Sequence, residues 1–332
     1  MTRNIVVNGR FLTRRLTGVE RHAGEVLRFF RHSCRVELTC RQGWSGHMWE
    51  QLILPRRLGE NHVLWSPANT GPLLVRNQAL TIHDLSPLEH PEWFLPGFAA
   101  WYRLFLPLVV KQVQRVFVPS AYVKKKVSRR FKIENVTITP NGVNHFIFCP
   151  DALQTACDLP ARYILFVGTL EPRKNLEGLL RAWGQINEQF RDTWLVIVGV
   201  NGNVFKKVRF PQDVERVRFL GYVDDQTLAG LYAHATLFVL PSFDEGFGLP
   251  ALEAMACGAP VLVSDGGALP EVVGQAAMIF CPADRDALSK AMSECLDDAS
   301  TRFLLQEKGL KRASQFSWGR TAELVWKELH EI

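Results

Sequence analysis

Hydrophobic and polar residues alternate in two patterns along the second half of the chain. Short apolar runs, several of them ending in glycine, are typical of strands buried on both faces of a parallel sheet. Between them lie segments with apolar residues three and four positions apart, such as Leu176, Leu179 and Leu180, which predict amphipathic helices. The predicted strands are Tyr163–Gly168, Trp194–Gly199, Val217–Gly221, Leu237–Leu240, Ala259–Ser264 and Ala277–Phe280.

Helix-end signals support the segments between these strands. Pro250 fits a first helical turn and Gly258 the position just past a helix end. Asp224 or Asp225 is expected to cap another helix. Four helices are predicted in this half. The first carries apolar residues from Leu176 to Phe190, and the second runs from the Asp224 cap through Tyr232. The third runs from Pro250 to Gly258, and the fourth covers Asp284–Leu296. This alternation predicts a doubly wound α/β domain.

The first half repeats the alternation less regularly. Its predicted strands are Asn4–Asn8, Leu80–His83, Val116–Val118 and Val136–Thr139. Its predicted helices are Gly18–Arg31, Phe98–Arg115 with a kink at Pro107, and Ala121–Phe131. The pattern indicates a second Rossmann-like domain, and two such domains in series would face each other across a cleft.

A length of 332 residues suits two domains. We place an N-terminal Rossmann-like domain at residues 1–157 and a C-terminal one at residues 158–316, with Phe148–Pro160 as the linker. The last segment, residues 317–332, is an amphipathic helix that we expect to pack back on the N-terminal domain.

Composition and charge exclude several classes of protein. Hydrophobic residues make up 47% and charged residues 22%, which excludes disordered and fibrous chains. The net charge of +6 hides an asymmetry, because residues 1–157 hold 21 Lys and Arg against 10 Asp and Glu. That half is at +11 and residues 158–332 are at −5, which suggests a polyanion near the first half.

The cysteines and the apolar segments bear on the compartment. The seven cysteines are odd in number and scattered, which argues against a disulfide framework and a zinc site and fits a reducing compartment. The N-terminal apolar stretch is too short for a signal peptide. The longest apolar segment, Phe94–Val110, contains Arg103 and Pro107 and is shorter than a comfortable span. We therefore expect a cytoplasmic protein that does not cross a membrane.

Two loops after strands of the second domain carry unusual polar groups. One follows the first strand from Gly168 and places Arg173 and Lys174 side by side before a helix, where a diphosphate would find two cations and a helix end. The alternative is a solvated turn. The other loop carries Glu245, with Glu253 one turn into the next helix, and two carboxylates so placed could accept hydrogen bonds from sugar hydroxyls. Here the alternative is a capping acid and an exposed helical glutamate.

These segments carry a family resemblance. EGFGLPALEAMACGAPVLVSDGGALPEVVG, from Glu245 to Gly274, resembles the Glu-x7-Glu region of retaining glycosyltransferases with the GT-B fold, in the large nucleotide-sugar-dependent family numbered four. GTLEPRKNLEGLL is similar to that family's phosphate loop, and FLGYVDDQTLAGLYAHATLFVLPS to its nucleotide-side segment. NGRFLTRRLTGVERHAGEVL, IHDLSPLEHPEWF, VPSAYVKKKV and ITPNGVN also have counterparts, closest to the mannosyltransferase branch that builds bacterial surface polysaccharides.

The resemblance implies roles for individual residues. Arg173 and Lys174 would hold the donor diphosphate, and Glu245 and His83 would act at the donor sugar or the reacting centre. Glu253 would bind the ribose. The loop before the first predicted helix, Leu16-Thr17-Gly18-Val19-Glu20, holds one glycine, Gly18, where many relatives have two or more. The further implied donor-binding residues are Gly18, Gly168, Gly221, Tyr222, Val223, Gly246, Phe247, Gly248 and Leu249. For His83, a structural histidine is the alternative.

The implied reaction is the retaining transfer of a hexose, mannose from GDP-mannose being the first choice, to a lipid-linked or oligosaccharide acceptor. Arg173 and Lys174 would stabilise the departing diphosphate in place of a metal. Asp224-Asp225 and Asp297-Asp298 are interpreted as helix ends, so no metal and no cofactor are expected. O-antigen, capsule or exopolysaccharide synthesis is the implied process.

Three further interpretations stay open. The cationic helix Ala121–Phe131 and Lys132 could dock on an anionic membrane surface at the inner face of the plasma membrane, or could be a solvated face. The chain could be a nucleotide-sugar hydrolase or epimerase of the same fold that uses no sugar acceptor. A nucleic-acid-binding module is disfavoured, because no aromatic-studded basic strand or recognition helix appears.

Overall fold

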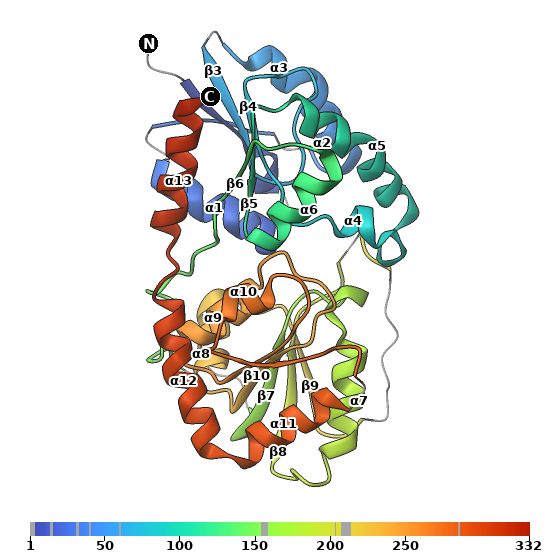
Figure 1. Ribbon diagram of the computed structural model, residues 1–332, viewed down its shortest axis with the longest axis vertical. Helices are drawn as coiled ribbons and strands as arrows, with labels where there is room; N and C mark the ends of the chain where they lie inside the picture. Colours follow the sequence, from blue (N-terminus) through green and yellow to red (C-terminus); the bar gives the residue numbers. More distant parts are fainter. Residues whose placement is uncertain are drawn as a thin grey trace. The chain divides into compact units, whose positions relative to one another are not determined.

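The computed structural model describes residues 4–332 except 14–15, 31–32, 40, 60, 154–158, 203, 207–213 and 285. The chain forms two compact units (Figure 1). The first unit comprises Met1–Glu89, Pro96–Gly142 and Ser317–Ile332, and the second comprises His90–Leu95 and Val143–Phe316. The predicted boundary between residues 157 and 158 and the centre of the predicted linker lie outside the described residues, and Arg31, the predicted end of the first helix, does too.

The second unit contains a parallel six-stranded sheet in the order β12-β11-β10-β7-β8-β9. The strand order across the sheet reverses between β7 and β10, which pair directly through Ile164 and Leu237. All six strands were predicted, within two residues at each end. They are β7 (Arg162–Val167), β8 (Thr193–Val198), β9 (Val217–Gly221), β10 (Leu237–Leu240), β11 (Val261–Ser264) and β12 (Met278–Phe280).

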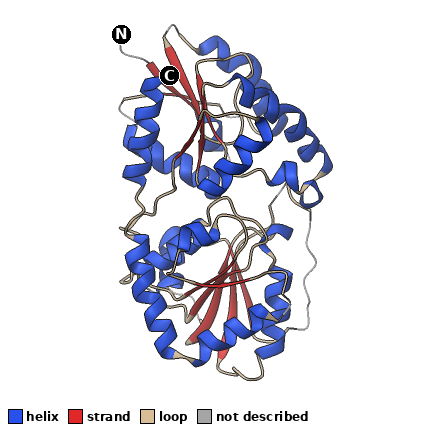
Figure 2. Cartoon of the chain, viewed as in Figure 1, coloured by secondary structure: helices blue, strands red, loops and turns tan. Residues whose placement is uncertain are grey.

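Helices cover both faces of this sheet (Figure 2). They are α7 (Leu176–Ile186), α8 (Asp225–Ala233), α9 (Leu249–Ala256), α10 (Leu269–Val273), α11 (Ala287–Asp297) and α12 (Ala299–Ala313). Phe190 lies beyond the end of α7, so its predicted place on that helix is wrong, although it is buried in the same core. α11 begins three residues late because Asp284 Oδ1 accepts from the backbone N–H of Ala287 at 3.1 Å. Asp224 caps α8 as expected.

The first unit contains a second parallel six-stranded sheet, in the order β2-β1-β3-β4-β5-β6. Its strands are β1 (Asn4–Asn8), β2 (Arg35–Glu37), β3 (His62–Ser66), β4 (Gln78–Thr81), β5 (Arg115–Val118) and β6 (Val136–Ile138). β2 and β3 were not predicted. β4 ends at Thr81, which places His83 in the loop after the strand and not within it. The order reverses between β1 and β3, so each unit has one topological switch point.

Three of the helical segments of the first unit form one continuous helix with a π-helical turn in its middle. α2 (Gly43–Met48), the π-helical turn η2 (Trp49–Ile53) and α3 (Leu54–Arg57) follow one another without a break. α5 spans Pro96–Gln112 through Pro107, and Arg115, predicted as helical, begins β5 instead. The others are the 3-10 turn η1 (Gly9–Thr13), α1 (Gly18–Phe30), α4 (Ser86–Glu89), α6 (Ala121–Phe131) and α13 (Trp318–Glu331). In the part of the chain that is described, no helix has the length and apolarity needed to span a membrane.

The last helix, α13, completes the first unit. It packs along α1, where the rings of Phe30 and Trp326 lie 5.1 Å apart. Arg115 of β5 forms an ion pair with Glu328 at 2.8 Å, and Thr321 donates to the carbonyl of Pro140 at 2.5 Å. These contacts tie the end of the chain to the sheet edge formed by β5 and β6.

Candidate functional site

The two loops singled out in the sequence meet at the switch point of the second unit. Gly168–Lys174 follows β7 and Ser242–Glu245 follows β10, and these strands are neighbours in the sheet. The carboxyl ends of parallel strands lie at one sheet edge, so the loops are brought together there. Arg173 and Lys174 belong to the short 3-10 turn η4 (Pro172–Lys174) just before α7. Phe243 N donates to the carbonyl of Arg173 at 2.8 Å, which joins the loops directly.

Glu245 is the centre of a buried charge cluster. Its carboxylate binds Arg173 Nη1 at 3.0 Å through Oε2, and Lys174 Nζ through Oε1. Both cations are thus held on one carboxylate, and all three side chains are at most 12% exposed. The interpretation of Arg173 and Lys174 as a solvated turn is therefore wrong: this cation pair lies in the interior.

Two members of this cluster were not singled out in the sequence. Glu171 Oε1 lies 2.7 Å from Arg173 Nη2, and Ser242 donates its hydroxyl to Glu245 Oε1 at 2.8 Å. Glu171 stands two residues before Arg173, and Ser242 three before Glu245, so proximity along the chain was the available signal. We call Glu171, Arg173, Lys174, Ser242 and Glu245 the Glu245 cluster.

The charges in the cluster set the ionisation of its two acids. Burial disfavours the charged form of Glu245, but Arg173 and Lys174 outweigh it and lower the pKa to about 2. For Glu171, burial dominates and raises the pKa above its usual value, with the same two cations acting against the shift. Glu245 is therefore ionised at neutral pH, and its carboxylate holds both cations in place.

Glycines let the chain pass close to Glu245. Gly267 has φ +70°, and a Cβ there would overlap the backbone of Glu245. The next residue, Ala268, donates its N–H to the Glu245 carbonyl at 2.8 Å. Gly248, with φ +95°, precedes α9, and its carbonyl accepts from the N–H groups of Ala251 at 3.0 Å and Leu252 at 3.3 Å. Gly246, Phe247 and Leu249 belong to the same turn, which connects the fixed Glu245 carboxylate to the start of α9.

The other donor-side residues surround this turn. Glu253 on α9 is 4% exposed and accepts from the Tyr232 hydroxyl at 3.3 Å, so the alternative of an exposed helical glutamate is wrong. Gly221 ends β9 with φ +71°, and the exposed Tyr222 and half-buried Val223 follow it. Gly168 lies against Lys174, because a Cβ there would meet the Lys174 side chain at 3.5 Å.

His83 lies in the first unit, just past β4. Its Nε2 lies 2.9 Å from the carbonyl of Pro67, and burial lowers its pKa. A carbonyl only accepts, so Nε2 carries the proton of the neutral ring. A bond from the ring to a backbone carbonyl is what we expect if His83 has a structural role, the alternative drawn from the sequence. His22 of α1, which the sequence reasoning missed, lies with its ring 4.9 Å from His83 and binds Asn141 at 2.8 Å through Nδ1. Burial, and the neighbouring His83, lower the pKa of His22 to about 3.

Gly18 is the exposed first residue of α1. Thr17 precedes it, and the Thr17 hydroxyl donates to the Glu20 carboxylate, an arrangement typical of a helix start. Gly18 is thus at a helix N-terminus, as the sequence pattern indicated.

The switch point of the first unit holds a second buried network that the sequence reasoning missed. Glu50 of η2 binds Arg10 Nη1 at 3.0 Å and Asn8 Nδ2 at 2.7 Å, and Thr70 donates to it at 3.1 Å. Burial opposes its ionisation, but His47, Arg10 and Asn8 outweigh it and lower the pKa of Glu50. We call Asn8, Arg10, His47, Glu50 and Thr70 the Glu50 network.

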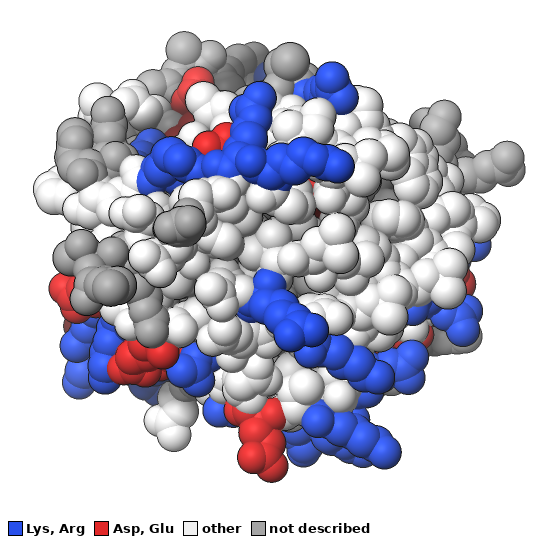
Figure 3. All heavy atoms as spheres, turned by 90° about the horizontal axis from the view of Figure 1, so that it is seen from above, with Lys and Arg blue, Asp and Glu red and all other residues white. Residues whose placement is uncertain are grey.

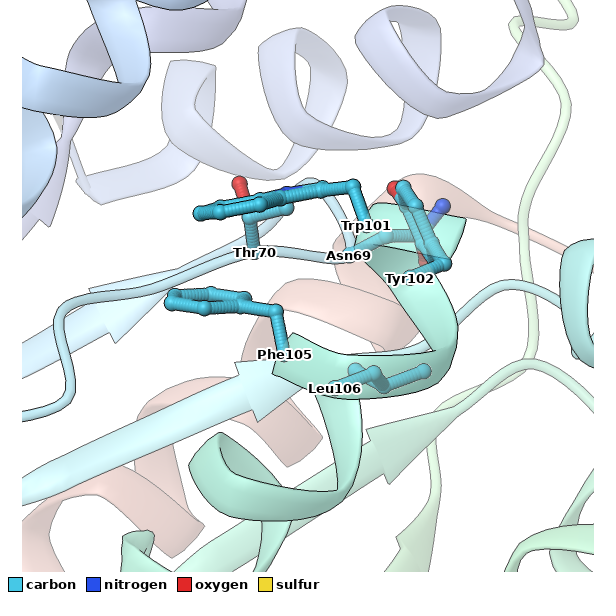
Figure 4. Close-up of a pocket in the computed structure, with 6 residues that line it drawn as sticks. All are labelled: Asn69, Thr70, Trp101, Tyr102, Phe105 and Leu106. Carbon is cyan, nitrogen blue, oxygen red and sulfur yellow. The ribbon is translucent and has the colours of Figure 1, made fainter. Parts of the chain in front are cut away.

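A shallow pocket lined partly by Thr70 adjoins this network. Figure 4 shows Trp101 of α5 lying beside Thr70, with Phe105 one turn further along the helix. The Trp101 and Phe105 rings stack at 4.6 Å. Asn69, Tyr102 and Leu106 complete the lining, so the pocket is largely aromatic and apolar.

No group of three or more His, Cys, Asp or Glu side chains suited to a metal ion occurs among the described residues. Lys and Arg dominate the charged surface visible in Figure 3.

Comparison with protein families matches both halves of the chain. The model for glycosyl transferases group 1 matches residues 154–312, and the model for glycosyltransferase family 4 matches residues 62–145. O-antigen chain mannosyltransferase B of Escherichia coli is 46% identical over 289 residues, covering 81% of this chain and 75% of that protein. O-antigen chain mannosyltransferase RfbU of Salmonella typhimurium is 29% identical over 262 residues, covering 77% and 71%.

Solved structures share the fold. A sucrose-phosphate synthase from Thermosynechococcus elongatus superposes with a TM-score of 0.77 at 21% identity over 99% of each chain. HepE of Anabaena, solved in complex with UDP and glucose, superposes with a TM-score of 0.76 at 17% identity over 100% of each chain.

Proposed function

The chain belongs to glycosyltransferase family 4 and has its GT-B fold, and we propose that it transfers mannose from GDP-mannose to a lipid-linked or oligosaccharide acceptor during bacterial surface polysaccharide synthesis. The similarity to two O-antigen mannosyltransferases supports the sugar and the process. The resemblance to retaining relatives supports retention of the anomeric configuration. The second unit binds the donor and the first unit binds the acceptor.

The observation that carries the proposal is the Glu245 cluster at the switch point between β7 and β10. Ligands of open α/β sheets bind at such points. Arg173 and Lys174 are pre-positioned there on a carboxylate whose pKa is about 2, so their geometry is set before a donor arrives. Pre-positioned charge stabilises a transition state without reorganisation at the moment of reaction.

The chemistry follows from charge development. When the bond between the anomeric carbon and the diphosphate breaks, the sugar gains positive charge and the diphosphate gains negative charge. Arg173 and Lys174 stabilise the departing diphosphate, a role that a metal ion fills in other enzymes. Glu245 accepts from donor-sugar hydroxyls through the oxygen positions not taken by its cations, with backbone N–H groups around Gly246, Phe247, Gly248 and Leu249 beside it. The acceptor hydroxyl attacks the anomeric carbon from the face that the diphosphate leaves, and its proton passes to an oxygen of the departing diphosphate.

The remaining residues complete the substrate contacts. Glu253 accepts from the ribose hydroxyls, and the backbone of Gly221, Tyr222 and Val223 meets the base, with Gly168 behind the phosphates. His83 and Gly18 of the first unit contact the donor or the acceptor. A lipid-linked acceptor calls for contact with the inner face of the plasma membrane, and the cations of α6 supply long-range attraction to an anionic surface.

A donor screen tests the proposal. We expect GDP to stabilise the protein against heat more than UDP or dTDP, since a ligand that binds only the folded state raises its stability by mass action. GDP-mannose should then release GDP when an oligosaccharide or lipid-linked acceptor is added, also in the presence of EDTA, and the product should keep the anomeric configuration of the donor.

Three outcomes would contradict the proposal. GDP release that is equally fast without an acceptor would indicate a hydrolase. Preference for UDP would overturn the GDP-mannose assignment, and loss of turnover with EDTA would overturn the role given to Arg173 and Lys174.

A further inference from the structure

We propose that an exposed apolar face of the first unit, built from α2, η2 and α5, inserts into the interfacial layer of an anionic lipid bilayer. This face consists of Trp44, Met48, Leu52, Leu74, Leu104 and Leu108, each between 48% and 82% exposed. The inference concerns how the protein meets a membrane, and it stands on exposure and charge independently of the transfer reaction.

The side chains of this face come from adjacent segments. Trp44 and Met48 are four residues apart on α2, and Leu52 follows on η2, so they lie along one side of the continuous helix. Leu104 and Leu108 are likewise four apart on α5. The ring of Trp101 on α5 lies 5.2 Å from that of Trp44, which joins the two helices. Gln51 Oε1 accepts from Leu73 N at 3.0 Å, which brings the loop with Leu74 beside η2.

The charges around this face fit an anionic partner. In residues 41–59 and 96–112, all of them described, the cations are Arg41, Arg56, Arg57, Arg103 and Lys111. Arg57 lies 3.4 Å from the carboxylate of Glu37 on β2, which leaves Arg41, Arg56, Arg103 and Lys111 to attract an anionic surface. The single acid there is Glu50, which is 1% exposed and paired with Arg10. The two segments therefore present cations and apolar side chains to solvent without an exposed carboxylate, the composition typical of surfaces that lie in a membrane interface.

The basic helix α6 presents cations to solvent, but its apolar side chains are buried. Its Val123, Val127 and Phe131 are buried in the core of the first unit. Lys126 binds Glu89 and the Tyr122 hydroxyl, so one of the cations of α6 already has partners within the protein. α6 can attract a membrane at a distance, whereas Trp44, Leu104 and Leu108 can enter it, since tryptophan prefers the interface and leucine the acyl layer.

Vesicle co-sedimentation tests the proposal with exposed substitutions that should leave the fold intact. We expect wild-type protein to bind phosphatidylcholine vesicles containing phosphatidylglycerol, and the double variant Leu104→Glu and Leu108→Glu to bind at least about tenfold more weakly. The matched control, Phe303→Glu with Leu304→Glu on α12 of the second unit, should bind like wild type, because those side chains are also exposed, at 61% and 49%, but lie outside this face.

Fluorescence locates the insertion. Brominated acyl chains should quench part of the tryptophan emission, and Trp44→Phe should remove most of that quenching. Release of GDP from GDP-mannose with an oligosaccharide acceptor, measured without vesicles, should be unchanged in the Leu104 and Leu108 variant, which separates a failure of docking from a failure of the proposed reaction.

Three results would overturn the proposal. The first is loss of vesicle binding on Lys125→Ala with Arg129→Ala in α6 while the Leu104 and Leu108 variant still binds. The second is the absence of binding by the wild-type protein. The third is a dimer in size-exclusion chromatography that the glutamate substitutions dissociate without any effect on vesicles, which would make this face a contact between two copies of the chain.

Discussion

Glu245 and Glu50 are two buried carboxylates, one in each unit. Each lies near the point where the strand order of its sheet reverses, and each binds an arginine at 3.0 Å. In both, burial opposes ionisation and the neighbouring groups outweigh it, so both pKa values lie below the usual range for glutamate. A buried ion pair at a switch point therefore does not by itself distinguish a ligand site from a structural network.

The surroundings of the two carboxylates differ. Glu245 stands in a loop just before α9, beside a glycine turn, and its carboxylate binds the two cations Arg173 and Lys174. Glu50 is part of the helical turn η2, and its carboxylate accepts from Asn8, Arg10 and Thr70, with His47 Nδ1 3.7 Å away. The first arrangement places two cations on one loop carboxylate, whereas in the second several polar side chains share one helical carboxylate. In our proposal the pair of cations marks the ligand site, and the switch point alone does not.

The largest expected effect of this difference is on stability. Arg10→Met leaves the Glu50 carboxylate buried without its guanidinium, which we expect to lower the free energy of unfolding by about 3–5 kcal/mol. Transfer per folded molecule should stay close to wild type, because the Glu50 network touches no substrate in our proposal. Denaturant unfolding followed by tryptophan fluorescence, alongside turnover corrected for the folded fraction, measures both.

A second substitution sharpens this prediction. Adding Glu50→Leu to Arg10→Met removes the unpaired charge and should recover part of the lost stability, since replacing both partners costs less than removing one. An Arg10→Met protein as stable as wild type, or one that is stable but inactive, would show that the Glu50 network was misassigned.

The next effect is on catalysis. Lys174→Ala removes one of the two cations proposed to stabilise the leaving diphosphate, and transfer should fall about 10²–10³-fold, equal to about 3–4 kcal/mol of barrier. The fold should survive, because Glu245 keeps Arg173 as a partner. Arg191→Ala, which breaks a surface pair with Glu188, is the matched control and should transfer normally. Near-normal turnover of the Lys174 variant would defeat the site assignment.

Glu245 itself is better tested by glutamine than by alanine. Glu245→Ala would leave two buried cations without their carboxylate and would confuse folding with catalysis. Glu245→Gln keeps the shape and removes the charge.

The smallest effect separates the glutamine variant from wild type at low pH. The pKa of Glu245 is lowered from 4.5 to about 2 in the folded protein, so its ionisation stabilises the fold above pH 4.5 and that contribution disappears as the pH falls towards 2. The free energy of unfolding of the wild type should fall by about 3 kcal/mol more than that of Glu245→Gln over this range. Parallel acid-induced unfolding curves for the two proteins would contradict the lowered pKa.

The sequence predicted the second sheet better than the first for a physical reason. β7 and β8 are buried on both faces, so their residues form continuous apolar runs. β2 is three residues long, Arg35-Val36-Glu37, and carries no such run. The helix α12 was missed because its sequence, ASTRFLLQEKGLKRA, is largely polar and buries only Leu305, Gly309 and Ala313.

The site shows a similar division. Arg173 and Lys174 stand out because two cations precede a predicted helix, and Glu245 because it lies in a glycine-flanked loop. Their mutual contact spans about seventy residues and depends on β7 pairing with β10, which local patterns do not encode. The same holds for Glu50 and Arg10, forty residues apart, and for His22 and Asn141, which meet only in the folded first unit.

The position of α13 has a consequence for biosynthesis. The second unit ends at Phe316, whereas the first unit requires Ser317–Ile332 to cover α1 and the edge formed by β5 and β6. A ribosome therefore delivers every residue of the second unit before it delivers the last helix of the first. Although domains generally mature from the N-terminus onward during translation, here the unit that begins the chain is the later one to be completed. Nascent chains stalled before residue 317 should thus contain a complete second unit and an incomplete first unit, in which Phe30 and the β5–β6 edge lack their contacts with α13.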